Sequence, residues 1–209
     1  MKRIAIFMLV LVVCAFTMPE RNITVFLVGD STMSDKPLDE NPERGWGQMF
    51  PQFFTQNISF QNHAQNGRST KSFITEGKWD TVMSRLKKGD YVLIQFGHND
   101  QKLADSNRSA PAHGLYKTNL IKFVNDVRNK GGNPILITPV MRRKFDEKGL
   151  FVDQHGDYPG VVKEVASLLK VPIIDLHKSS EALIVAQGVE GSKKIFLNIP
   201  PGHFKNRSE

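Results

Sequence analysis

The stretch Val25–Met33, VFLVGDSTM, joins an apolar run directly to Gly29, Asp30 and Ser31. An uninterrupted apolar run that stops at a glycine is typical of a strand buried on both faces. We therefore predict a strand over residues 23–28 that is followed by a tight strand-to-helix turn. Ser31 lies in that turn, where its hydroxyl would be exposed and its backbone N–H would lack a partner. Ser31 is thus a candidate nucleophile, and the alternative is that it only caps the following helix.

The rest of the chain alternates between strand and helix patterns. Further strands are predicted at 58–62, 91–96, 134–138 and 171–175, and helices at about 78–87, 113–130, 157–170 and 178–187. Strands separated by helices of this length imply right-handed crossovers and a parallel sheet that is covered on both faces. The sequence therefore predicts an α/β fold, a three-layer α/β/α sandwich around a five-stranded, mostly parallel sheet.

The N-terminus has the pattern of an export signal. Met1, Lys2 and Arg3 precede an apolar run over 4–16, which is short for a membrane span and fits a secretory signal. We expect a signal peptide at 1–18, one domain over 19–209, and a periplasmic or extracellular protein without stable membrane insertion. An uncleaved anchor is the alternative, and lipid attachment at Cys14 is a weaker one. Cys14 is the only cysteine and would leave with the signal, so no disulfide is expected.

Charge and motifs exclude several classes of partner and cofactor. The formal net charge is +7, or +5 without Lys2 and Arg3, which suits an acidic polysaccharide but also serves solubility alone. The basic residues are scattered and no aromatic-rich basic motif occurs, so we predict no nucleic-acid partner. There is no His-Glu-x-x-His and no P-loop, and Gly45-x-Gly47 lacks the third glycine of a dinucleotide fingerprint. We expect no metal and no cofactor.

Polar loops follow the second and third predicted strands as well as the first. The segment 62–69 contains Gly67, and the segment 97–100 contains Asn99. Loops after parallel strands meet at the carboxyl edge of the sheet. The N–H groups of Ser31 and Gly67 and the side-chain amide of Asn99 would suit the oxyanion that forms during ester hydrolysis. Ordinary turn roles for Gly67 and Asn99 are the alternative.

These three segments resemble the first three sequence blocks of the GDSL, or SGNH, hydrolases. Two later segments, 138–145 and 152–159, resemble the rhamnogalacturonan acetylesterase branch of that family. The resemblance implies a flavodoxin-like fold and a secreted esterase that removes acetyl groups from pectin-type polysaccharide. It also implies that Ser31 is the nucleophile and that Ser31, Gly67 and Asn99 form the oxyanion hole. Arg142 and Arg143 follow the fourth strand, and we predict that they bind the sugar or a uronate carboxylate.

The acid and base of the reaction are harder to find. The resemblance implies a late Asp-x-x-His motif, and this sequence contains none; His203 follows a proline at that spacing and is a weak candidate. Asp153-x-His155 belongs to the branch-specific loop and is expected to be structural or on the substrate side. Asp175-x-His177 is expected to begin a helix. We therefore expect that the sequence stops before its catalytic dyad. The alternative function is an inactive truncated homologue that acts at most as a carbohydrate-binding module.

Overall fold

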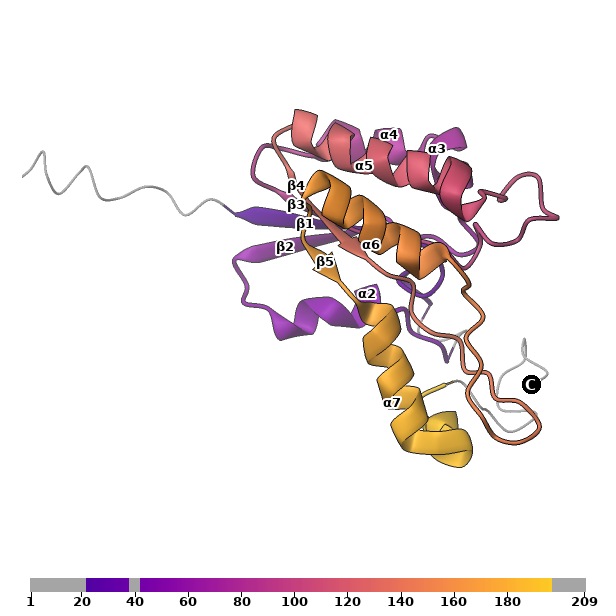
Figure 1. Ribbon diagram of the computed structural model, residues 1–209. Helices are drawn as coiled ribbons and strands as arrows, with labels where there is room; N and C mark the ends of the chain where they lie inside the picture. The colour runs from indigo at the N-terminus through magenta and orange to yellow at the C-terminus, as the bar shows by residue number, and fades with distance from the viewer. Residues whose placement is uncertain (1–21, 38–41, 197–209) are drawn as a thin grey trace, which may run out of the picture.

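The computed structural model describes residues 22–37 and 42–196 (Figure 1). The predicted signal peptide at 1–18 and the candidate base His203 lie outside these ranges. Within them, no helix has both the length and the apolar character that crossing a membrane requires.

A five-stranded sheet forms the centre of the molecule. Its strands are β1 (Ile23–Gly29), β2 (Ile58–Asn62), β3 (Tyr91–Gln95), β4 (Asn133–Ile137) and β5 (Ile173–Ile174). The order is β2-β1-β3-β4-β5 and every pairing is parallel, with Gly29 at the end of β1 opposite Gln95 at the end of β3. The loops that follow these two strands therefore start side by side at the carboxyl edge of the sheet.

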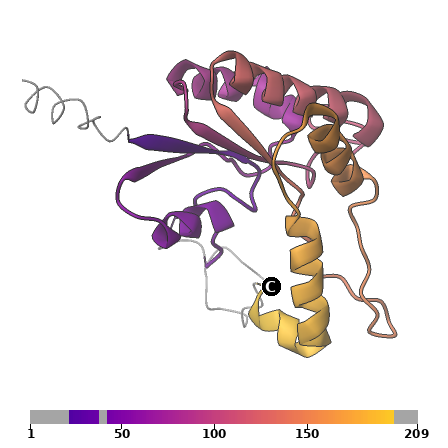
Figure 2. The ribbon, with the colours of Figure 1, turned by 60° about the vertical axis from the view of Figure 1, so that its left-hand side comes forward.

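Helices cover both faces of the sheet (Figures 1 and 2). One face carries α3 (Thr70–Thr75), α4 (Lys78–Arg85), α5 (Lys117–Asn129) and α6 (Tyr158–Leu169), with η2 (Ala112–Tyr116) leading into α5. The other side carries α2 (Trp46–Met49) and η1 (Phe50–Phe53), and α7 (Leu176–Gly191) with η3 (Ser192–Lys194) extends away from the sheet on that side. The predicted three-layer α/β/α sandwich is confirmed.

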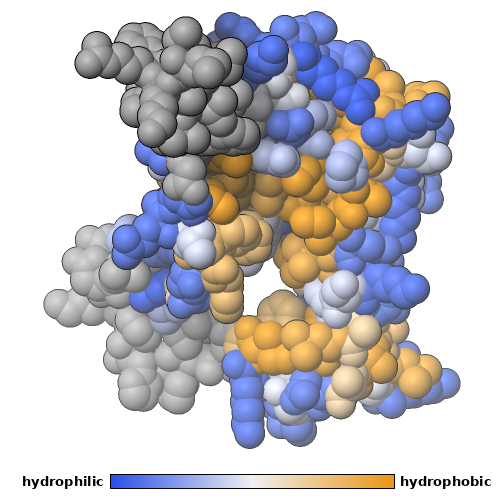
Figure 3. All heavy atoms as spheres, turned by 90° about the vertical axis from the view of Figure 1, so that its left-hand side faces the viewer, coloured by the Kyte–Doolittle hydropathy of each residue, from blue (hydrophilic) through white to orange (hydrophobic). Residues whose placement is uncertain are grey.

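The two faces of the sheet differ in how well they are packed. The larger core lies under α3 to α6, where Val92 and Ile94 of β3 are buried with Phe123 and Val165. The core on the opposite face is much smaller. On that side Phe53 is 77% exposed and α7 leaves Leu183 and Val185 about half exposed. Figure 3 shows apolar surface around an opening on the side of the molecule where the strands begin.

Several elements differ in extent from the sequence prediction. Residues 31–34 form a turn that is followed by irregular chain at 35–37 rather than by a helix, so Ser31 is not a helix cap. The predicted helix at 113–130 is interrupted at Gly114, whose φ of −107° and ψ of −113° are not helical. The fifth strand pairs with β4 only through Ile173 and Ile174.

Candidate active site

The turn after β1 presents Ser31 at the carboxyl edge of the sheet. The N–H groups of Met33 and Ser34 both donate to the carbonyl of Asp30, at 3.2 and 3.1 Å, and close the chain on itself. Asp30 is fully buried, whereas Ser31 is partly exposed. Within the described residues, neither the hydroxyl nor the backbone N–H of Ser31 has a hydrogen-bond partner. Both groups of Ser31 are therefore available to a substrate.

A chain of partly buried hydrogen bonds holds this turn in place. The indole N–H of Trp46 donates to Gln95 Oε1 at 2.5 Å, and Gln95 Nε2 donates to the hydroxyl of Thr32 at 2.8 Å. The hydroxyl and the backbone N–H of Thr32 donate in turn to Asp30 Oδ1, at 2.8 and 2.9 Å. The residues on both sides of Ser31 are thus fixed to β3 and to α2.

Two glycines allow α2 to approach the turn this closely. A Cβ atom on Gly45 would lie 2.1 Å from the carbonyl oxygen of Ser34, and one on Gly47 would lie 2.5 Å from that of Met33. Neither distance is compatible with a side chain. The Gly45-x-Gly47 pair, which fails as a dinucleotide fingerprint, is therefore a packing motif beneath the candidate nucleophile.

The loop after β2 brings Gly67 to the same edge. Gln65 N–H donates to the carbonyl of Gly29 at 3.0 Å, which anchors this loop to the end of β1. Asn66 Oδ1 accepts hydrogen bonds from the hydroxyl of Ser34, at 2.7 Å, and from the buried ammonium of Lys36. Gly67 then adopts φ of +77°, a left-handed conformation that favours glycine. In the described chain the N–H of Gly67, like that of Ser31, has no hydrogen-bond partner.

The loop after β3 locks the Gly67 loop in place. Asn99 is buried and its side-chain amide donates to the carbonyl of Arg68 at 3.0 Å. Asp100 Oδ1 accepts from the backbone N–H and the hydroxyl of Thr70, at 2.9 and 2.6 Å, at the start of α3. Its second oxygen, Oδ2, is buried without a partner among the described residues. Burial raises the pKa of Asp100 to about 7, although the bonds from Thr70 oppose this shift.

The structure therefore brings the three predicted residues to neighbouring loops of one sheet edge. The unpaired N–H groups of Ser31 and Gly67 come from the first two loops, and the amide of Asn99, already bonded to the second loop, comes from the third. Backbone N–H groups that have no partner within the protein can donate to an acceptor that binds at this edge. A tetrahedral oxyanion is such an acceptor.

The histidines near this edge have structural partners. The Nε2 atoms of His98 and His155 lie 2.7 and 3.0 Å from the carbonyl of Val140, and the two rings are 4.6 Å apart. Burial is the main cause that lowers the pKa of both rings, that of His155 to about 3. His177 is the second residue of α7, as predicted, and its Nε2 is 3.1 Å from Asp153 Oδ2 without hydrogen-bond geometry. In the residues described, no histidine bonds to Ser31.

The two predicted substrate arginines lie in different surroundings. Arg142 Nη2 donates to the carbonyl of His98 at 3.0 Å, which places Arg142 beside the loop that carries Asn99. Arg143 donates to Ser192 Oγ and to the carbonyl of Val189, at the far end of α7. Arg142 is thus near the three-loop edge, whereas the guanidinium of Arg143 joins its loop to α7. Substrate contact by either residue stays a prediction.

Residues 27–188 match the GDSL-like lipase/acylhydrolase family. The chain belongs to this family. By family it is a carboxylic ester hydrolase. The resemblance to the rhamnogalacturonan acetylesterase branch is likewise confirmed.

Individual relatives support the same assignment. The chain is 42% identical over 189 residues to the rhamnogalacturonan acetylesterase RhgT of Bacillus subtilis, covering 90% of this chain and 80% of RhgT. It is 33% identical to the probable rhamnogalacturonan acetylesterase YesY of the same organism, over 83% of this chain and 79% of YesY. The crystal structure of the Bacillus subtilis protein YxiM superposes with a TM-score of 0.75 at 27% identity, over 86% of this chain and 51% of YxiM.

Proposed function

We propose that this protein is an exported serine esterase that removes acetyl groups from a pectin-type polysaccharide. The observation that carries the chemistry is the pair of unpaired N–H groups at Ser31 and Gly67 beside an unpaired serine hydroxyl. The names of RhgT and YesY support the acetyl ester and the pectin substrate. The signal-like sequence at the N-terminus supports export.

In the proposed reaction, Ser31 Oγ attacks the acetyl carbonyl carbon while a base accepts the hydroxyl proton. The carbonyl oxygen becomes an oxyanion that accepts hydrogen bonds from the N–H groups of Ser31 and Gly67 and from the amide of Asn99. The sugar oxygen leaves with a proton, and water then hydrolyses the acetyl-serine. Among the described residues none bonds to the Ser31 hydroxyl, so none of them is assigned as the acid or the base.

This last point supports a second candidate, a protein that binds the polysaccharide without hydrolysing it. It rests on the lack of any described hydrogen-bond partner for the Ser31 hydroxyl, because an unactivated serine is a weak nucleophile.

One experiment separates the two candidates. Acetate release is measured from acetylated rhamnogalacturonan and acetylated xylan, with the protein and with Ser31→Ala, alongside labelling by a serine-directed organophosphonate. An esterase releases acetate from the pectin substrate, is labelled at Ser31, and loses both properties in Ser31→Ala. Labelling at another serine contradicts the proposed nucleophile. Binding without acetate release favours the second candidate.

A further inference from the structure

A cavity of about 240 Å³ opens directly beside Gly67. It is lined by residues of the β2–α3 and β3–η2 segments and of α3, namely Gly67, Arg68, Ser72, Glu76, Asp105, Asn107 and Arg108. Pockets for drug-sized ligands are typically about 300–1,000 Å³, so this one suits a single sugar residue. Because Gly67 forms one of its walls, a group held in this cavity is a direct neighbour of the acetyl group undergoing attack.

Arg108 points one end of its guanidinium at this wall. A Cβ atom on Gly67 would lie 3.8 Å from Arg108 Nη1, and no other atom would be within 4 Å of it. The side chain of Arg108 is 32% exposed, so it is accessible to a ligand. Among the described residues, Nη1 has no hydrogen-bond partner.

Asp105 holds Arg108 in this orientation. Its Oδ2 accepts from Arg108 Nε at 2.6 Å and lies 2.5 Å from Nη2, and Arg108 is the main cause that lowers the pKa of Asp105. The loop is braced further because Asp105 Oδ1 accepts from the N–H of Asn107 at 3.0 Å. Asp105 thus contacts the Nε and Nη2 edge of the Arg108 guanidinium and leaves the Nη1 side free. A fixed fork with free N–H groups is suited to a carboxylate.

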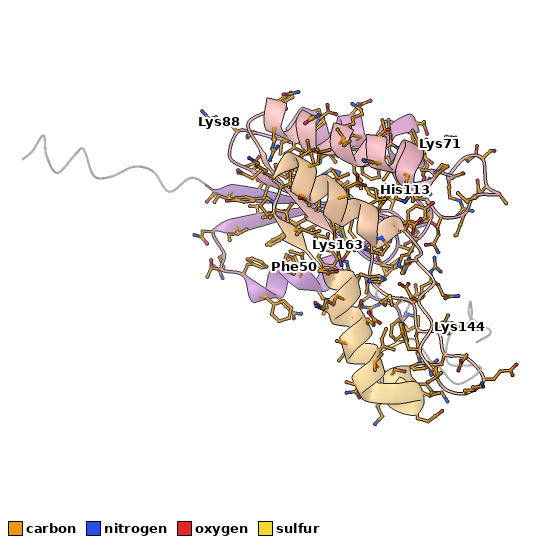
Figure 4. All side chains as sticks on the ribbon, viewed as in Figure 1. Phe50, Lys71, Lys88, His113, Lys144 and Lys163 are labelled. Carbon is orange, nitrogen blue, oxygen red and sulfur yellow. The ribbon has the colours of Figure 1, made fainter. Side chains whose placement is uncertain are left out.

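The charge around the cavity favours an anion. Glu76 and Asp105 are paired with Arg68 and Arg108, but two lysines add positive charge. Lys71 extends from α3 to the carbonyl of Ser106 in the same loop, at the carboxyl edge of the sheet in Figure 4. The pKa of Lys102 is lowered first by burial and then by the positive charges of Arg108 and Arg142. Because these positive side chains lie close enough to repel one another, the electrostatic potential around the cavity favours a bound anion.

We propose that Arg108 binds the carboxylate of a uronic acid residue in this cavity, next to the acetylated sugar. The proposal rests on the proposed pectin substrate and adds a specificity residue to it. With a polysaccharide that has no carboxylates, the free N–H groups of the Arg108 guanidinium would donate only to water. Arg108 thereby makes the site prefer an acidic polymer over a neutral acetylated one.

The test measures binding, so it does not depend on catalysis. A deacetylated rhamnogalacturonan oligosaccharide and its carboxyl-reduced, neutral form are titrated into the full chain by calorimetry. Each is repeated with Arg108→Ala, Arg108→Lys and the matched control Arg85→Ala, an exposed arginine at the end of α4 that does not line the cavity. Thermal unfolding verifies that each variant is folded.

We expect the unmodified chain to bind the acidic ligand about tenfold more tightly than the neutral one, as for a hydrogen bond to a charged group. The ratio of the two affinities should fall close to one in Arg108→Ala. It should fall to an intermediate value in Arg108→Lys, which keeps the positive charge but loses the planar guanidinium. It stays at its original value in Arg85→Ala. An equal loss of preference in Arg85→Ala would show general charge attraction and overturn the proposal, as would an undiminished preference in Arg108→Ala.

The acetate-release assay distinguishes the two proposals. If the carboxylate preference depends on Arg108 but no acetate is released from the acetylated polymer, the subsite stands and the esterase assignment fails. If acetate is released and the preference does not depend on Arg108, the esterase stands and the subsite fails.

Discussion

Replacing Asp100 by asparagine should remove a pH-dependent loss of stability. Burial raises the pKa of this carboxyl from 3.8 to about 7, and its Oδ2 has no partner among the described residues. The folded protein therefore holds the Asp100 proton more tightly than the unfolded chain does. This contribution to stability is fully present below about pH 4 and is lost as the pH rises through 7. One pKa unit corresponds to about 1.4 kcal/mol, so the loss amounts to at most about 4 kcal/mol by pH 8.

Asparagine keeps the acceptor oxygen that receives the two hydrogen bonds from Thr70, and it cannot ionise. The free energy of unfolding is measured by urea titration at intervals from pH 4 to pH 8 for the unmodified chain and for Asp100→Asn. The variant should gain stability relative to the unmodified chain as the pH rises, by more than about 1 kcal/mol between pH 4 and pH 8.

Asp105→Asn provides a control of opposite sign. Arg108 lowers the pKa of Asp105, so the unmodified carboxylate contributes stability above its unfolded pKa and loses it in acid. That variant should lose stability relative to the unmodified chain as the pH rises toward about 4, and the difference should then stay nearly constant up to pH 8. If the difference between the unmodified chain and Asp100→Asn is constant from pH 4 to pH 8, Asp100 does not titrate in this range and the reasoning is refuted.

Three further predictions concern activity. On an aryl acetate, a chain with an added C-terminal Asp-x-x-His segment should turn over faster than the same chain without it, because no described histidine bonds to the Ser31 hydroxyl. A rate that is high without the segment and is lost in His203→Ala would instead identify His203 as the base. In the most active form, Asn99→Ala should lower kcat by about 10²–10³ with little change in KM, because its amide acts mainly in the transition state; a change confined to KM would make Asn99 a substrate-binding residue. Gln95→Leu should lower kcat and cost about 1–3 kcal/mol of unfolding free energy, because Trp46 and Thr32 lose their buried partner; unchanged kcat would show that the bonds beneath Ser31 do not position it.

Most of the fold could be predicted because its signals are local. The apolar runs at 23–28 and 91–96 became β1 and β3 within one residue, since a central parallel strand is apolar on both faces. The fifth strand was harder, because Pro172 supplies only its carbonyl to β4 and Ile173 and Ile174 are exposed. The helix at 113–130 was predicted too long, because its periodicity continues through the kink at Gly114.

The site was predictable only where it follows from strand order. Ser31, Gly67 and Asn99 each follow a strand, so parallel topology was enough to bring their loops to one edge. Arg108 lies far along the loop after β3, and its direction depends on the turn that Asp105 makes with Asn107. The bonds within that turn are local, but its place beside Gly67 depends on the packing of the loop against α3, where Lys71 bonds to the carbonyl of Ser106, and no periodic pattern records that contact. The glycines at 45 and 47 were visible, but their partner, the carbonyl-rich turn at 33–34, is distant in sequence.

The described hydrogen bonds hold the loops of the proposed oxyanion hole together without a contribution from the catalytic base. Ser34 is bonded to Asn66, Asn99 to the carbonyl of Arg68, and Asp100 to Thr70, so each loop is fixed by its neighbour. None of these bonds involves a residue after 100. Proteases stripped of triad members retain a rate of roughly 10³–10⁴ over water through their oxyanion holes and binding. A chain whose serine lacks a base should therefore keep a small rate of ester hydrolysis that is lost in Asn99→Ala. Such a rate would show that the oxyanion hole is already formed without the base, and its absence would show that the hole forms only together with the base.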